Sequence, residues 1–167
     1  DNSLVTLKEI ANNMRPHLLK NFGLEKAIET FADQLFSVTG IKYSLFLNID
    51  KQNLSEEMNI SLYRIVCELM NNSLKHARPN SVYLEITESD KLLVMNYKDD
   101  GCGFENFQQH PENKQTGMGF DNITSRTRLL KGMYYIDTAP GKGFSIEFYF
   151  PKKESGKTKS GFSETSF

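Results

Sequence analysis

Apolar residues recur at spacings of three and four along four stretches of the chain. This spacing predicts helices over residues 3–14, 24–39, 59–77 and 119–131. The pattern is strongest over the third stretch, where one apolar stripe is typical of a helix that packs on a core. The residues of that stripe are Leu62, Ile65, Val66, Leu69 and Met70.

Proline and glycine mark the ends of these helices. Arg15-Pro16 interrupts the first helix and Ala77-Arg-Pro79 ends the third, because a residue before proline avoids the α conformation. Gly40 is a stop signal for the second helix. The expected apolar face of that second helix consists of Leu24, Ala27, Ile28, Phe31, Leu35 and Val38.

Alternating apolar and polar residues predict strands between and after the helices. The expected strands are residues 41–49, 81–88, 92–98, 133–138 and 143–150, with turns at 89–91 and 139–143. Residues 101–118 are rich in Gly, Asn and Gln and are expected to form a long loop, which is often a functional feature in a compact domain. From Lys152 onward the polar composition predicts a disordered tail.

Composition limits the classes of protein that this chain can be. Its 167 residues fit one domain, and a net charge of −1 provides no basic field for nucleic acid. No apolar run approaches the roughly 20 residues that span a bilayer. Because the chain begins at Asp1 rather than Met, we expect it to be part of a longer protein.

The two cysteines indicate neither a disulfide framework nor a zinc site, since they are few and far apart in sequence. Cys67 lies in the strongest helix and is expected in the core, whereas Cys102 lies between two glycines and is expected at the surface. A reducing, cytosolic setting is the default for such a chain.

Three polar residues of the 59–77 helix share one face. Glu68, Asn72 and Lys75 stand at i, i+4 and i+7, and at about 100° per residue they lie in one line. An Asn carbonyl oxygen suits magnesium, Glu68 could orient or deprotonate an attacking group, and Lys75 could neutralise phosphate charge. The alternative is a solvated polar stripe on an amphipathic helix.

Two glycine-rich turns follow this helix in the sequence. Asp99-x-Gly101-x-Gly103 comes straight after a predicted strand, where Asp99 could accept a hydrogen bond from an exocyclic amine such as that of adenine. Gly117-x-Gly119 opens a helix, whose first amides favour phosphate. Each turn alone could be an ordinary surface turn, and neither is a Walker loop or a Rossmann fingerprint.

In combination, these motifs resemble the ATP-binding superfamily shared by sensor histidine kinases, gyrase-type topoisomerases, heat-shock chaperones and mismatch-repair ATPases. Residues 64–77 (RIVCELMNNSLKHA) are similar to the N box of the nitrate-sensor-like class of bacterial histidine kinases. Residues 99–104, 117–126 and 141–143 resemble its three glycine boxes. The segment from Met14 to Ala27 is similar to the one that joins the dimerisation helices to the ATP-binding domain in that class.

The resemblance implies a role for each residue of the N box. Glu68 would be the general base or orienting group, and Asn72 would be the magnesium ligand. Asn71 occupies the neighbouring position and is not expected to be the ligand. Lys75 and His76 would approach the phosphates of ATP.

The resemblance also implies roles for the glycine boxes. Asp99 would read the adenine amine, with Gly101 and Gly103 shaping the wall of the site. Residues 104–118 would form an ATP lid hinged at Gly103 and Gly117. The remaining glycines of the implied ATP site are Gly119, Gly141 and Gly143.

The chain departs from this family in two respects. The family usually has Thr after the third glycine box, whereas here Phe144 follows Gly143, and Ser145 could substitute only in an altered register. The phosphoacceptor box is absent, since the only histidines are His17, expected in the linker, His76, expected at the nucleotide, and His110, expected on the lid. We therefore expect ATP binding without efficient self-phosphorylation.

The resemblance implies an α/β fold of the Bergerat type, a two-layer sandwich with a mixed sheet of about five strands and three main helices on one face. We expect residues 1–23 to be the end of a dimerisation helix and a linker, residues 24–151 the ATP-binding domain, and residues 152–167 the tail. The implied activity is transfer of the γ-phosphate of ATP, with Mg2+, to a His on a separate dimerisation domain. A serine kinase of the anti-sigma type, another ATPase on the same scaffold, or a degenerate module without nucleotide are the alternatives.

The implied partners are ATP, an upstream dimerisation and phosphoacceptor domain, and a response regulator, with no nucleic acid and no direct membrane contact. The fragment is expected to be a monomer and the full-length protein a homodimer. The expected location is the cytoplasm, and the full-length protein could be anchored in a membrane with this domain on the cytoplasmic side.

Overall fold

A computed structural model describes residues 16–50, 54–104 and 118–152 of the chain. The predicted helix over 3–14, the predicted tail of residues 152–167 beyond its first residue, and most of the predicted lid, with Gly117 and His110, lie outside these residues. That first tail residue, Lys152, is held in place by its N–H, which donates to the Lys91 carbonyl at 2.9 Å. No helix within the described ranges is both long and apolar enough to cross a membrane.

Five strands form one mixed sheet in the spatial order β1-β2-β3-β5-β4. β1 and β2 are parallel, and all other neighbours are antiparallel. The strands are β1 (Lys42–Asn48), β2 (Ser81–Glu88), β3 (Leu92–Asp99), β4 (Met133–Thr138) and β5 (Phe144–Pro151). The five predicted strands are therefore confirmed with boundaries within one residue.

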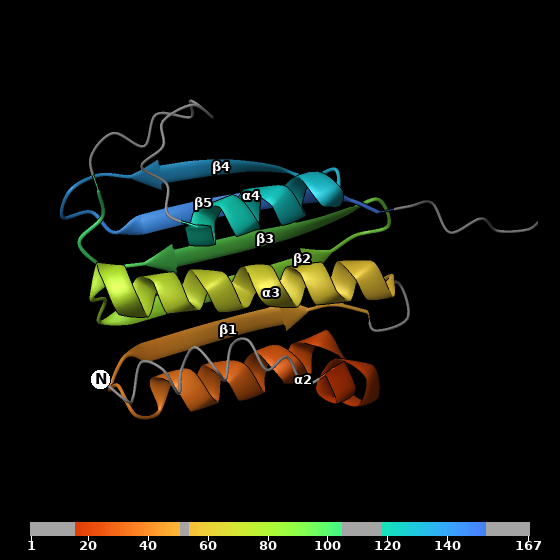
Figure 1. The fold of residues 1–167 in the computed structure, drawn as a ribbon, viewed down its shortest axis with the longest axis horizontal. Coiled ribbons are helices and arrows are strands. Elements are labelled where there is room, and N and C mark those ends of the chain that lie inside the picture. Colours follow the sequence, from red (N-terminus) through yellow and green to blue (C-terminus); the bar gives the residue numbers. More distant parts are fainter. Residues whose placement is uncertain (1–15, 51–53, 105–117, 153–167) are drawn as a thin grey trace, which may run out of the picture.

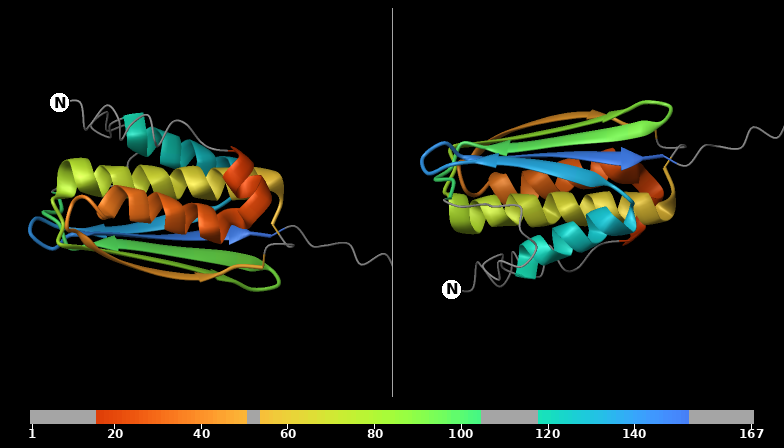
Figure 2. Two further views of the ribbon diagram at one scale, coloured as in Figure 1. Left: turned by 90° about the horizontal axis from the view of Figure 1, so that it is seen from below. Right: turned by 90° about the horizontal axis from the view of Figure 1, so that it is seen from above.

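Three helices cover one face of this sheet, which confirms the predicted two-layer α/β sandwich (Figures 1 and 2). They are α2 (Pro16–Phe36), α3 (Glu56–Asn72) and α4 (Met118–Leu129). α3 lies between the other two and contacts both. The central helix is accordingly buried along most of its length, from Met58 to Asn71.

α3 begins three residues before the predicted boundary because Ser55 caps it. The backbone N–H of Met58 donates to the Ser55 hydroxyl at 3.2 Å, and Glu56 and Glu57 occupy the first turn, where negative charge favours the helix dipole. At its other end the helix continues as a π-helical turn over Ser73–Ala77. Arg78, at φ 50°, ends the helix before Pro79, at the predicted place.

α2 differs from its prediction at both ends. The helix starts at Pro16 and is kinked at Gly23, whose φ of 83° is not helical. It ends at Phe36, because a hydrogen-bonded turn that leads to Gly40, at φ 73°, replaces the last helical turn. Val38, which the helical spacing placed on the apolar face, lies in this turn and is 78% exposed, so that assignment was wrong.

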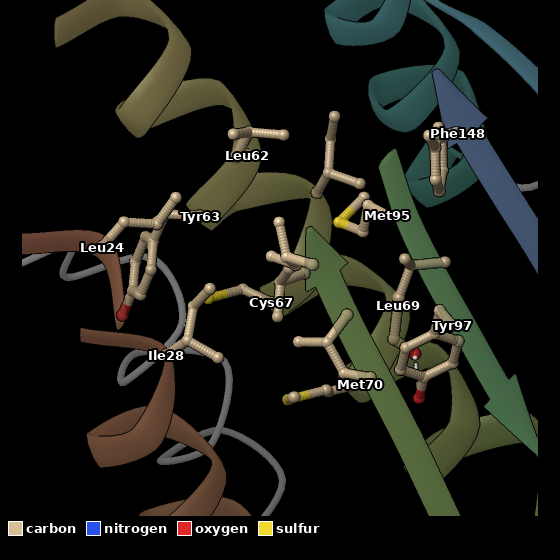
Figure 3. Close-up of a cluster of buried hydrophobic side chains, with 14 of the residues drawn as sticks. Leu24, Ile28, Leu62, Tyr63, Cys67, Leu69, Met70, Met95, Tyr97 and Phe148 are labelled. Carbon is tan, nitrogen blue, oxygen red and sulfur yellow. Dashed lines mark hydrogen bonds between the residues drawn. The ribbon is translucent and has the colours of Figure 1, made fainter. Parts of the chain in front are cut away.

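The core is made by the inward residues of the strands and the facing sides of α2 and α3 (Figure 3). Alternation places Leu93, Met95 and Tyr97 of β3 on the covered face, and all three are fully buried. Asp99 has the same parity as Tyr97 and is 7% exposed. The last residue of β3 thus carries a carboxylate on the side that faces the helices.

Asp100 ties the end of β3 to the start of β2. Its Oδ1 accepts from the N–H of Asn80 at 2.7 Å and of Ser81 at 2.8 Å, and its Oδ2 accepts from the Ser81 hydroxyl at 2.9 Å. The Ser81 N–H is the main cause that holds the pKa of Asp100 below its ordinary value.

We predict that Asp100→Ala lowers the free energy of unfolding by about 1 kcal/mol at neutral pH. Because the folded-state pKa is lowered, the contribution is present above the ordinary carboxyl pKa and is lost as the pH falls through the folded-state value. Denaturant unfolding at several pH values measures it, with Asp90→Ala in the exposed β2–β3 turn as the control. A difference that persists unchanged at acidic pH would contradict this role.

Candidate functional site

Gly119, in the first turn of α4, lies directly on the polar face of α3. A Cβ atom placed at Gly119 would overlap the Glu68 carboxylate and would lie 3.3 Å from Asn72 Oδ1. Both side chains are half-buried at this contact. The structure therefore brings together a carboxylate, a carboxamide and the first turn of a helix, the end at which the helix dipole favours negative charge.

Asn71, the other carboxamide of this segment, does not share this position. Its side chain is 5% exposed, and its Nδ2 donates to the Cys67 carbonyl at 2.8 Å. Its Oδ1 is buried without a hydrogen-bond partner among the described residues. Asn72 is thus the carboxamide that faces Gly119 and the remainder of the site.

Lys75 and His76 lie in the π-helical turn that follows α3, and both are exposed. The sequence predicted a regular helix to Ala77, with Lys75 in line with Glu68. A π turn holds more residues than an α turn, so each residue rotates less about the axis. Lys75 is therefore offset from the line that a spacing of about 100° per residue gives. π turns of this kind are common at functional sites.

Asp99 lies at the bottom of the same region and is held by two hydrogen bonds. The Ser73 hydroxyl donates to its Oδ2 at 2.5 Å, and the Gly101 N–H donates to its Oδ1 at 2.9 Å. Ser73 is itself 3% exposed and lies one residue after Asn72. The N box and the end of β3 thus meet at a single buried carboxylate.

The turn that follows Asp99 packs on the end of the α3 segment. A Cβ atom at Gly101 would lie 2.5 Å from both the Cβ and the carbonyl oxygen of Ala77, so only glycine fits. The Cys102 N–H donates to that carbonyl at 2.8 Å. The helix end is satisfied by this turn, which fixes the first glycine box against the N box.

The third glycine box closes the site from the side of β5. Gly143, at φ 75°, passes so close to the backbone of Asp99 that a Cβ atom would overlap the Asp99 carbonyl oxygen. Gly103, at φ 58°, is pressed in the same way against the carbonyl oxygen of Ala139. Gly141, also at φ 75°, meets nothing within 4 Å, and its N–H donates to the Cys102 carbonyl at 2.7 Å.

Ser145 does not replace the threonine that the family places after this box. Phe144 pairs with Asp99 across β3 and β5, and strand alternation puts Phe144 on the covered face and Ser145 on the opposite one. The pairing of β3 with β5 is continuous here, so the altered register that the substitution by Ser145 would require is not seen. Phe144 instead stacks on Phe104, with ring centroids 5.7 Å apart.

Three residues near the site were missed by the sequence analysis. Ser73 and Tyr97 support Asp99, because the Tyr97 hydroxyl lies 2.8 Å from the Ser73 hydroxyl. Arg126 of α4 lies close to Arg64 and Glu68: burial and repulsion from Arg64 lower its pKa, and Glu68 partly offsets them. The buried polarity of Tyr97 in an apolar strand was a usable signal, whereas the position of Arg126 depends on how α4 packs.

The described residues of the site fit a magnesium ion only if a nucleotide and water supply most of its ligands. The described residues contain no group of three His, Cys, Asp or Glu side chains that could hold a metal ion. Asn72 offers a single neutral oxygen beside Gly119. Magnesium accepts such an arrangement when phosphate oxygens and water supply the other positions, so the residues fit a metal that arrives with a nucleotide.

Comparison with protein families gives one matching description, "Histidine kinase-, DNA gyrase B-, and HSP90-like ATPase", over residues 57–154. This range is more than half of the chain. It includes α3 from its second residue onward and all three glycine boxes.

Curated proteins and solved structures give matches of the same kind. The chain is 30% identical over 142 residues to the sensor histidine kinase ComP of Bacillus subtilis, covering 84% of this chain and 18% of that protein. It is 29% identical over 150 residues to the histidine-protein kinase/phosphatase DegS of Brevibacillus brevis, covering 89% of this chain and 38% of that protein. The histidine kinase domain of the blue-light activated kinase EL346 of Erythrobacter litoralis has the same fold, with a TM-score of 0.65 at 18% identity, covering 77% and 61% of the two chains.

We predict that Gly143→Ala destabilises the domain far more than Gly141→Ala. Both positions have a φ of 75°, so both pay about 1–2 kcal/mol of backbone strain. Only at Gly143 does the added methyl group meet the Asp99 carbonyl, which adds roughly 1–3 kcal/mol. Thermal and denaturant unfolding of the two variants measure the difference, and equal losses would show that the close approach does not matter.

Proposed function

The chain belongs to the family of histidine kinase-, DNA gyrase B- and HSP90-like ATPases, and we propose that it is the ATP-binding catalytic part of a sensor histidine kinase. In this proposal it binds ATP with Mg2+ and transfers the γ-phosphate to a histidine on a separate dimerisation domain. One of the two curated relatives compared above is named a sensor histidine kinase, and the other is named a signal transduction histidine-protein kinase/phosphatase.

The observation that carries this proposal is the contact of Gly119 with Glu68 and Asn72. The beginning of α4, a carboxylate and a carboxamide converge there, while Asp99 lies buried beside Ser73 on the same helix segment. A terminal phosphate is bound by N–H donors, and the group that attacks it needs a nearby base. The amine of adenine needs a hydrogen-bond acceptor. The end of the site at Gly119 would thus receive the phosphates of ATP, and the end at Asp99 would receive the adenine.

The proposed roles are those that the family resemblance implies, and the positions of the side chains support them. Asn72 would hold Mg2+, and Glu68 would orient the attacking imidazole or accept its proton. The exposed Lys75 and His76 would lie along the phosphates, and Asp99 would accept from the adenine amine. When bound, Mg2+ would supply charge neutralisation for the phosphates.

The remaining glycines would shape the site. Gly143 packs on the backbone of Asp99, and the Gly101 N–H donates to the Asp99 carboxylate. Gly103 packs on the Ala139 carbonyl, and the Gly141 N–H donates to the Cys102 carbonyl, so both would support the same turn. Gly117 and Gly119 would open the helix that receives the phosphates, and residues 104–118 would form the lid. Of these, Gly117 and most of the lid lie outside the described residues.

The whole protein would require further parts. The chain spans 18% and 38% of the lengths of the two curated relatives compared above. We propose that an upstream dimerisation domain provides the phosphoacceptor histidine and that a response regulator receives the phosphoryl group. We also propose that residues 1–23 are the end of a dimerisation helix and a linker, which the kink of α2 at Gly23 supports. The proposed location is the cytoplasm, the proposed full-length form is a homodimer, and this chain alone would be a monomer.

We predict that Asn72→Ala abolishes magnesium-dependent ATP binding and phosphoryl transfer, because the metal loses its protein ligand. Labelled ATP, the chain and a histidine-bearing dimerisation fragment of a relative are mixed, and acid lability distinguishes phosphohistidine from phosphoserine. Asn48→Ala, exposed on the edge strand β1, is the matched control. Undiminished transfer by Asn72→Ala would overturn the assignment, and an acid-stable product would favour a serine kinase.

Asp99→Asn is predicted to weaken ATP binding at least tenfold while changing folding much less. The amide replaces one acceptor oxygen by a donor that faces the adenine amine, yet it keeps the size of the side chain. Isothermal titration calorimetry measures the affinity, and thermal unfolding measures the stability. Asp137→Asn, exposed on β4, is the control, and equal affinities for the wild type and Asp99→Asn would exclude the adenine role.

A further inference from the structure

Asp99 stands at the end of a chain of buried hydroxyl groups. The Ser73 hydroxyl lies 2.5 Å from Asp99 Oδ2, and the Tyr97 hydroxyl lies 2.8 Å from Ser73 Oγ. Tyr97 is fully buried and Ser73 is 3% exposed. Three polar groups in hydrogen-bond contact are thus buried together at the predicted adenine site.

The direction of this chain follows from the donors and acceptors that are available. Burial, and then the negative charge of Asp99, raise the pKa of Tyr97, so its phenol remains a donor at physiological pH. The phenol can donate to Ser73 Oγ or to the Leu69 carbonyl, which is 3.3 Å away. The Ser73 proton is directed to Asp99, because a carboxylate only accepts hydrogen bonds.

Two donors therefore hold the Asp99 carboxylate, one on each oxygen. Ser73 donates to Oδ2, and the Gly101 N–H donates to Oδ1 at 2.9 Å. The lone pairs that remain can only accept. Among purines, a 6-amino group donates to such a carboxylate, whereas a 6-oxo group would place one acceptor against another.

We propose that Ser73 and Tyr97 are positioning residues that act through Asp99 and set the preference of the site for 6-amino over 6-oxo purine nucleotides. The proposal rests on the proposed function, since it assigns a base to the Asp99 end of the site. Without the Ser73 hydroxyl, the carboxylate can turn, so the favourable contact with an amine weakens and the conflict with an oxo group is relieved. Tyr97 acts one step further away by fixing the direction of the Ser73 hydroxyl.

The experiment compares the affinities of ADP and inosine diphosphate by calorimetry on the whole chain, for the wild type, Ser73→Ala and Tyr97→Phe. We expect Ser73→Ala to weaken ADP about tenfold, as the loss of one hydrogen bond to a charged group implies, and inosine diphosphate less than twofold. Tyr97→Phe should shift the same ratio by about threefold. Ser61→Ala is the matched control, because Ser61 is a serine of the same helix that is 2% exposed and lies away from the site.

A double-mutant cycle separates action through Asp99 from a general structural effect. If Ser73 works through Asp99, Ser73→Ala should have no further effect on ADP affinity in the Asp99→Asn background. Additive losses in that cycle would overturn the proposal. An unchanged ratio of ADP affinity to inosine diphosphate affinity in Ser73→Ala would also overturn it.

The outcomes also distinguish this proposal from the function on which it rests. A wild-type chain that binds neither nucleotide would overturn both, whereas wild-type ADP binding with unchanged ratios in the variants would overturn only the positioning role. If Ser73→Ala does not fold, Tyr97→Phe decides alone, because it removes a single oxygen and leaves the ring in place. An unchanged ratio of the ADP and inosine diphosphate affinities in Tyr97→Phe then refutes the positioning role.

Discussion

The close packing of the turn after β3 on the end of the α3 segment is the contact on which the rest of the site depends. Gly101 approaches Ala77 so closely that no side chain fits between them, and the Cys102 N–H satisfies the Ala77 carbonyl. This contact fixes the height of Asp99 relative to the helix that carries Ser73 and Asn72. Because both elements also belong to the core, the geometry of the nucleotide site is coupled to the stability of the domain.

The three glycine boxes contribute to the site in different physical ways. Gly101 and Gly143 allow backbone to meet backbone, where a methyl group would force two chain segments apart. Gly119 instead allows backbone to approach the flexible carboxylate of Glu68, which could move aside at little cost. Gly101 and Gly143 are therefore required for the fold, whereas Gly119 is required to keep the Glu68 carboxylate in its place at the site.

Much of this arrangement is encoded locally. The strands and the N-box helix follow from periodicity, and Asp99 follows from its place at a strand end. The early start of α3 was missed because the Ser55 cap is a polar signal outside the apolar stripe. The π turn over Ser73–Ala77 and the opposite facing of Ser145 depend on the packing of the helix end on β3 and on strand parity, which residue spacing alone does not provide. The prediction that Val38 lies on the apolar face of its helix was wrong because the residue lies in a turn, where helical spacing does not apply.

The two cysteines differ in exposure, so one of them can be labelled selectively. Burial raises the pKa of the Cys67 thiol to about 12, so it stays protonated and unreactive, while Cys102 is exposed between two glycines of the first box. A thiol-directed fluorophore added to the unmodified protein will therefore attach at one position, between Gly101 and Gly103. Its emission would follow occupancy of the site without any engineered label.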